Sequence, residues 1–190
     1  MSIAMQAAGL ITPPIHQEIE ELFAQRTRIC LWLGAVFFSF FALLDYVHAR
    51  PFFSLFLAYR LSYVLVVIGL LQLLRNPSVR PFTREVMFGA MLLGTLVISL
   101  MTVKLGGFAS GYYVGILLMI AGGFSVLPLN VTQSLSLGGG MYLIYVFTVY
   151  LGSRPLDGSE INYCINNSFF FCSIVFMFNR ISTTHWIFNS

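Results

Sequence analysis

Long apolar stretches alternate with short polar segments along the chain. Each apolar stretch is roughly 20 residues long, the length that crosses a lipid bilayer as an α-helix. A membrane-spanning β-strand would instead alternate apolar and polar residues over roughly 10 positions, and these stretches do not. The pattern therefore predicts six transmembrane helices, at residues 29–47, 52–74, 86–103, 112–127, 135–151 and 161–178.

The polar segments between these stretches contain prolines, which rarely occupy helix interiors, at Pro51, Pro77, Pro81 and Pro128. Short connections place consecutive helices side by side and antiparallel. The expected fold is therefore all-α and integral to the membrane. It is a six-transmembrane-helix bundle built from three sequential hairpins.

A different pattern precedes the first predicted span. Ile15, Ile19, Leu22 and Phe23 fall on one face of a helix over residues 15–28, with acidic residues and arginines elsewhere. Such an amphipathic N-terminal helix typically lies flat on the membrane surface. A water-exposed helical lead into the first span has the same pattern, and both interpretations remain open.

The composition also favours a membrane protein. Charged residues make up 9% of the 190 residues and hydrophobic residues 58%. A soluble domain carries about 25% charged residues, so this chain has too few to cover a water-exposed surface. The expected partner of the bundle is a lipid membrane, and no nucleic-acid partner is expected.

Basic residues predict the orientation, because cytoplasmic loops carry an excess of arginine and lysine. With the N-terminus inside, the outer side holds Arg50, Lys104 and Arg154. The inner side then holds twice as many basic residues, namely Arg26, Arg28, Arg75, Arg80, Arg84 and Arg180. This bias predicts that both termini are cytoplasmic.

Arg60 is the most unusual residue, because it lies within the second predicted span. A charge there costs about 2.5–3.5 kcal/mol on insertion scales, so it should have a partner. Asp45, near the end of the first span, is the closest acidic candidate across the turn at residues 48–51. We predict an ion pair that either fixes the first hairpin or lines a pocket for a ligand such as a quinone.

A glycine-rich segment at residues 106–115 (GGFASGYYVG) leads into the fourth predicted span. Its glycines permit a tight re-entry of the chain into the membrane. Tyr112 and Tyr113 suit a membrane interface, where tyrosine is common. The alternative is that they form the outer lip of a ligand pocket and contribute hydroxyl groups.

Two adjacent amides, Asn166 and Asn167, begin the membrane part of the sixth span and precede the aromatic residues 169–171. Amides in an apolar helix need partners on other helices. They either hold the bundle together or bind a polar group of a ligand. The glycines at residues 122–123 and 138–140 are instead typical of close helix packing.

The predicted topology places His16 and His185 on the same, inner side of the membrane. Two histidines on facing helices hold the iron of haem b in some proteins, so a haem-binding redox module is one alternative function. His48 lies on the outer side, where a lone histidine is usually just solvated.

The sequence shows no Ser–His–Asp set, phosphate-binding loop, metal cluster or pair of carboxylates within the bundle. We therefore expect no enzymatic activity from this chain itself. A small transporter is a further alternative, although the broken helices of such proteins, at matching positions of two halves, are not evident.

Two segments resemble a known class of membrane sensor. Residues 106–115 resemble the GG-x-x-S-P-Y-Y-A-G segment of six-helix sensor modules, with Gly111 in place of proline and Val114 in place of alanine. Residues 166–170 (NNSFF) resemble the start of the last helix of that class. Such modules precede the catalytic domains of bacterial histidine kinases and class III adenylate cyclases. The architecture is also similar to α-hydroxyketone quorum-sensing kinase sensors and to the diheme-b anchors of some cyclases.

The resemblance implies a sensor or anchor in the bacterial inner membrane. A small apolar ligand or the quinone redox state would bias the bundle, and a homodimer would transmit this to a C-terminal output domain outside this chain. Residues 1–28 are then a cytoplasmic segment with an amphipathic helix, and residues 29–179 are the sensor domain. Residues 180–190 begin a signalling helix.

Overall fold

The computed structural model describes the backbone of residues 2–152 and 158–188 and the side chains of residues 21–76, 78–152, 158 and 160–177. Every regular element in this part of the chain is a helix, which confirms the predicted all-α class. The α-helices are α1 (Ser2–His48), α2 (Phe53–Leu73), α3 (Thr83–Lys104), α4 (Val114–Val126), α5 (Val131–Gly152) and α6 (Gly158–Phe188). The short 3-10 turns are η1 (Arg50–Phe52), η2 (Pro77–Phe82), η3 (Gly107–Ala109) and η4 (Gly111–Tyr113).

Four helical segments are long and apolar enough to cross a membrane: Glu21–His48, Arg50–Leu73, Ser78–Lys104 and Val131–Gly152. The segment Gly111–Val126 is apolar but shorter. Large apolar side chains stay exposed on the outer faces of the helices, as at Leu65, Leu143 and Phe169. Water would disfavour so much exposed apolar surface, whereas lipid covers it. The described residues therefore form a helical bundle suited to a lipid membrane.

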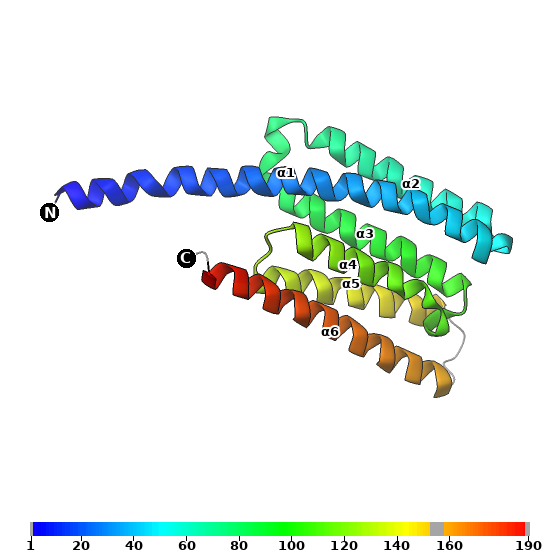
Figure 1. The fold of residues 1–190 in the computed structure, drawn as a ribbon. Helices are drawn as coiled ribbons and strands as arrows, with labels where there is room; N and C mark the ends of the chain where they lie inside the picture. The colour runs from blue at the N-terminus through cyan, green and yellow to red at the C-terminus, as the bar shows by residue number, and fades with distance from the viewer. Residues whose placement is uncertain (1, 153–157, 189–190) are drawn as a thin grey trace.

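The six helices run in alternating directions (Figure 1). The N-terminal end of α1 and the C-terminal end of α6 therefore lie at the same end of the bundle. Helices α1 and α2 pack side by side as an antiparallel hairpin, and so do α5 and α6. The middle pair differs from the expectation of three simple hairpins. Helix α3 packs most extensively against α5, and α4 packs against α6 and α1 as well as against α3.

Helix α3 forms the centre of the bundle. The buried share of its most apolar stretch is 56%, whereas the buried share of the corresponding stretch is 22–28% in the other three candidate spans. Small residues let membrane helices approach closely. A Cβ atom at Gly152 of α5 would lie 2.6 Å from Val103 of α3, closer than side chains approach, whereas one at Gly140 would make an ordinary contact of 3.5 Å with Leu92. The glycine at the end of α5 therefore permits the close contact with α3 there.

The segment that precedes the first predicted span is not a separate element, because α1 runs without interruption from Ser2 to His48. Of the four apolar residues expected on one face, Phe23 is buried in the bundle and the Arg84 guanidinium lies 5.2 Å above its ring. Leu22 is exposed. Ile15 and Ile19 lie outside the residues whose side chains are described.

Two neighbouring glycines of α5 predict opposite effects of the same substitution. A Cβ atom at Gly138 would lie 2.8 Å from a methyl group of Val175 on α6, whereas one at Gly139 would meet nothing within 4 Å. Gly138→Ala should lower the free energy of unfolding by about 1 kcal/mol, because overpacking against a stiff valine exceeds the gain in helix propensity. Gly139→Ala should raise it by about 0.5–1 kcal/mol. Thermal unfolding in detergent, followed by circular dichroism, measures both, and equal shifts would contradict the α5–α6 contact.

Candidate ligand-binding site

A tight turn brings the first two helices together around a buried charge pair. Helix α1 ends at His48, where the Ala49 amide donates a hydrogen bond to the Asp45 carbonyl at 2.8 Å. The η1 turn contains Pro51, whose fixed φ suits the start of such a turn. Helix α2 then runs back along α1, so that Asp45 and Arg60 come to the same level of the bundle.

The Asp45 carboxylate and the Arg60 guanidinium form the ion pair that the sequence predicts. Arg60 Nε donates to Asp45 Oδ2 at 2.5 Å and Arg60 Nη2 donates to Asp45 Oδ1 at 3.0 Å. Both residues are buried, with 1% of Asp45 and 6% of Arg60 exposed. A paired geometry of this kind with two parallel hydrogen bonds is the form in which a membrane interior tolerates charge.

Tyr112 adds a third element to the pair. Gly106 and Gly107, with φ of 108° and 64°, take the left-handed backbone that favours glycine, and they turn the chain after α3. Ser110 Oγ then accepts a hydrogen bond from the Tyr112 amide at 3.3 Å. The Tyr112 hydroxyl donates to Asp45 Oδ1. The carboxylate of α1 is therefore bonded both to α2 and to the turn that begins α4.

Aromatic rings and one backbone carbonyl complete the surroundings of the guanidinium. Arg60 Cζ lies 5.7 Å from the centre of the Phe38 ring and 5.9 Å from that of Phe41. Arg60 Nη1 also donates to the Phe38 carbonyl at 3.4 Å. Ring faces stabilise a cation most where water is excluded.

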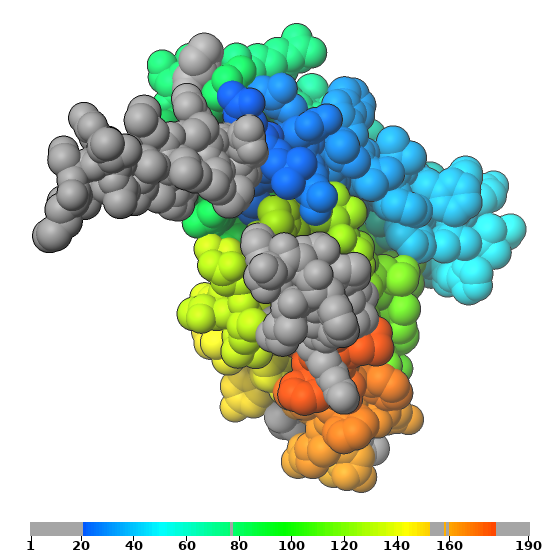
Figure 2. Space-filling model, turned by 60° about the vertical axis from the view of Figure 1, so that its left-hand side comes forward, coloured from blue at the N-terminus to red at the C-terminus, as the bar shows by residue number. Residues whose placement is uncertain are grey.

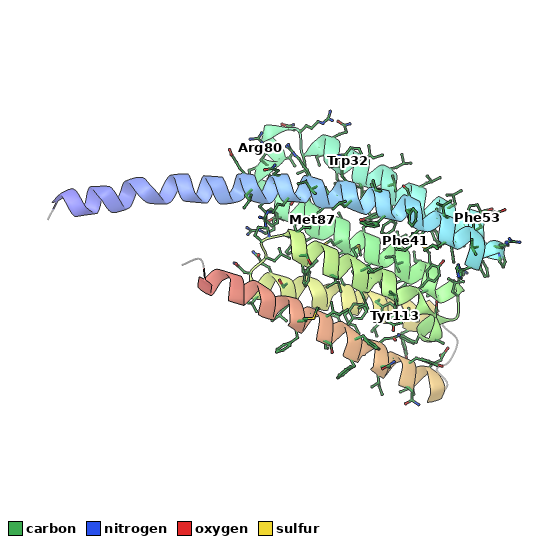
Figure 3. The ribbon with its side chains drawn as sticks, in the orientation of Figure 1. Trp32, Phe41, Phe53, Arg80, Met87 and Tyr113 are labelled. Atoms are coloured by element: carbon green, nitrogen blue, oxygen red, sulfur yellow. The ribbon has the colours of Figure 1, made fainter. Side chains whose placement is uncertain are left out.

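A cavity of about 490 Å³ extends from this polar group between α1, α2, α3 and α4. Its lining runs along α1 from Cys30 to Phe41 and along α4 from Gly115 to Val126, with Arg60 and Tyr112 at one end. Figure 3 labels Phe41 near that end and Met87 of α3 farther along. We call this cavity the α1–α4 cleft. Its volume and its mainly apolar lining with few polar groups are typical of small-molecule sites.

The other polar residues singled out in the sequence do not join this group. The Asn167 amide is buried and donates to the Phe108 carbonyl at 3.1 Å and to the Tyr145 hydroxyl at 3.0 Å, so it fastens α6 to η3 and α5. Asn166 is exposed. Tyr113 is half-buried and packs against the hydrophobic core without lining the α1–α4 cleft. Of the six candidates, the structure brings together Asp45, Arg60 and Tyr112.

Sequence reasoning missed the two glycines that leave room in the α1–α4 cleft. Gly122 was expected to serve close packing together with Gly123. A Cβ atom at Gly123 would indeed lie 2.6 Å from Met91, but one at Gly122 or at Gly34 would meet nothing within 4 Å. Gly34 and Gly122 both line the α1–α4 cleft, from α1 and α4 respectively. The only signal in the sequence was a small residue in each of two apolar helices.

The histidines proposed to hold haem b lie outside the described side chains. His16 is in the N-terminal part of α1 and His185 in the C-terminal part of α6, so the haem hypothesis stays a prediction. His48 is exposed, and its Nδ1 lies 3.2 Å from the Leu44 carbonyl. Among the described residues, no three His, Cys, Asp or Glu side chains are grouped as metal ligands would be.

No protein-family model, no curated protein and no solved structure matches this chain. The interpretation of the site therefore rests on its own geometry.

Proposed function

We propose that this chain is the membrane sensor or anchor module of a bacterial signalling receptor, and that the α1–α4 cleft holds the ligand it senses. The observation that carries the proposal is the position of the Asp45–Arg60–Tyr112 group at one end of the cleft. This group bonds α1 to α2 and to the start of α4. A ligand beside it would act on the contacts that set the distance between α1 and α4.

Two further hydrogen bonds fasten α1 at the opposite end of the α1–α4 cleft. Arg26 Nη1 donates to the Val126 carbonyl, at the end of α4, at 3.3 Å. Arg28 Nη2 donates to the Leu74 carbonyl, just beyond α2, at 2.8 Å. Because the cleft lies between these contacts and Asp45, a ligand that favours one spacing of α1 and α4 shifts the bundle between two arrangements.

The proposal includes six membrane crossings with both termini cytoplasmic, in the bacterial inner membrane. Four apolar helices of sufficient length, the shorter α4 and the alternating directions in Figure 1 support this topology. The excess of arginines at the end that holds the α2–α3 connection supports the orientation. The homodimer and the cyclase or histidine kinase output domain are the parts of the proposal that come from the resemblance.

A fusion of residues 1–190 to a class III cyclase catalytic domain tests the signalling role. Cyclic AMP is measured in a bacterium that lacks its own cyclase, with and without added quinones, membrane lipids and candidate autoinducers. Tyr112→Phe removes one hydrogen bond to a charged group, worth about 1.5–3 kcal/mol. Where only one of the two arrangements keeps this bond, its loss shifts the balance about 10- to 150-fold. We expect a matching change in cyclic AMP output.

Tyr113→Phe is the matched control, because Tyr113 carries the same hydroxyl one residue farther along and makes no contact with Asp45 among the described hydrogen bonds. It should leave the output unchanged. If neither Tyr112→Phe nor any added compound alters the output of a fusion present at normal levels in the membrane, the sensory role is wrong. A plain membrane anchor would then remain.

A further inference from the structure

The α1–α4 cleft is open on its lipid-facing side. Leu33 and Phe37 of α1 and Leu118 and Gly122 of α4 line it, and all four are exposed at the surface of the bundle. Helices α1 and α4 lie next to each other on the face seen in Figure 2. A molecule dissolved in the bilayer therefore has a direct path into the cleft, without passing through water.

The shape of the α1–α4 cleft suits a chain rather than a compact molecule. The lining from Cys30 to Phe41 extends roughly 17 Å along α1, at about 1.5 Å per residue. This is more than half of the roughly 30 Å hydrocarbon core of a bilayer. Gly34 and Gly122 leave open space along this path, since a Cβ atom at either would meet nothing within 4 Å. This open space is long enough for an extended apolar chain.

Arg60 defines the chemistry at the polar end of the α1–α4 cleft. A guanidinium has five N–H donors and no acceptor. Three hydrogen bonds are present, two to the Asp45 carboxylate and one to the Phe38 carbonyl. The Tyr112 hydroxyl also lies within hydrogen-bonding reach of the guanidinium. One N–H group of Arg60 is therefore left without a partner among the described residues, and Arg60 lines the cleft. A head group that accepts a hydrogen bond is complementary to it.

Charge balance further restricts which head groups can bind beside Arg60. The positive charge of Arg60 is already neutralised by Asp45, which binds it through both carboxylate oxygens. A second anion would be left without its own cation in a low-dielectric site, which is strongly unfavourable. A cation would face Arg60 at close range. An uncharged acceptor, such as a carbonyl oxygen, meets neither penalty.

We infer that the α1–α4 cleft binds an uncharged amphiphile from the bilayer, with its carbonyl head at Arg60 and its apolar chain along α1 and α4. Isoprenoid quinones and acyl esters share this chemistry. The inference deepens the proposed function by naming the ligand class of the same cleft. Binding is independent of any output domain, so it is measured on the 190-residue protein alone.

The test uses photoaffinity labelling of the protein in lipid nanodiscs. The probe is a long-chain methyl ester with a photoreactive diazirine in its chain, and mass spectrometry locates the labelled peptides. We expect labelling of α1 and α4 at residues that line the α1–α4 cleft. The unlabelled methyl ester should displace the probe at least tenfold better than the carboxylate, the amine or the alkane of equal chain length. A quinone and a diacylglycerol serve as separate competitors. They show whether the carbonyl head group belongs to a quinone or to an acyl ester.

Gly122→Leu fills the α1–α4 cleft and should reduce labelling at least tenfold. Gly69→Leu is the matched control, because Gly69 also lies within a helix with nothing within 4 Å of a Cβ atom, but it does not line the cleft. Circular dichroism checks that both variants keep the helical content. Equal labelling of the two variants, or equal displacement by the carboxylate or the alkane, would overturn the inference.

The two proposals fail in different ways. Absence of specific labelling overturns the ligand class and leaves the fusion experiment to decide the sensory role. Specific labelling supports the lipid-binding cleft even where the cyclic AMP output of the fusion does not change, and that unchanged output removes the sensory role.

Discussion

Replacing Arg60 with methionine is expected to lower the free energy of unfolding by about 3–5 kcal/mol. The substitution would leave Asp45, of which 1% is exposed, buried without a cation, and such an uncompensated charge is strongly destabilising. Tyr112 would still donate its hydroxyl, but one neutral donor does not replace a guanidinium that binds both carboxylate oxygens. Chemical or thermal unfolding in detergent or bicelles, followed by circular dichroism, measures the loss.

Arg50→Met is the matched control for this prediction. Arg50 is exposed at the same end of the bundle, and its guanidinium lies 5.7 Å from the centre of the Tyr46 ring. Its loss should cost less than about 1 kcal/mol. The double variant Asp45→Leu/Arg60→Met should recover most of the stability, because replacing a whole buried pair with apolar residues is often neutral. Equal losses in the single and double variants would contradict the coupling of Asp45 and Arg60.

The second and third helices follow closely from the sequence, whereas α1 begins well before its expected span. The expected spans at residues 52–74 and 86–103 correspond to α2 (Phe53–Leu73) and to most of α3 (Thr83–Lys104). The length of an apolar run and the prolines beside it determine where a membrane helix begins and ends. Neither feature says which faces meet, so the close packing of α3 on α5 was not foreseen. That contact depends on which residues of α5 face α3, and an apolar run does not reveal them.

The charged part of the site was also predictable, but the cavity was not. A charge in a membrane helix requires a partner, and the short turn after α1 leaves Asp45 as the candidate for Arg60. The α1–α4 cleft depends on the difference between the volume that four helices enclose and the volume that their side chains fill. Gly122 and Gly123 are the same residue type, yet one faces open space and the other faces Met91. Successive residues of a helix point in directions about 100° apart, so two adjacent glycines face different surroundings.

The same difference in direction separates the effects expected at the two adjacent asparagines of α6. Asn167 is buried and bonds α6 to the Phe108 carbonyl and to the Tyr145 hydroxyl. Hydrogen bonds between membrane helices contribute about 0.6–1.7 kcal/mol each. Asn167→Leu should therefore lower the free energy of unfolding by roughly 1–3 kcal/mol, because it also leaves a buried carbonyl without its donor. Unfolding in detergent measures the change.

Asn166→Leu provides the control, with the same substitution one position away on an exposed face of α6. It should change stability by no more than about 0.5 kcal/mol, as substitutions outside packed contacts usually do. Tyr145→Phe removes one of the two partners of Asn167 and should produce part of its effect. Combining Tyr145→Phe with Asn167→Leu should then add less than the sum of the two single losses, since both remove the same hydrogen bond. A larger loss for Asn166→Leu than for Asn167→Leu would mean that α6 presents its other face to η3 and α5.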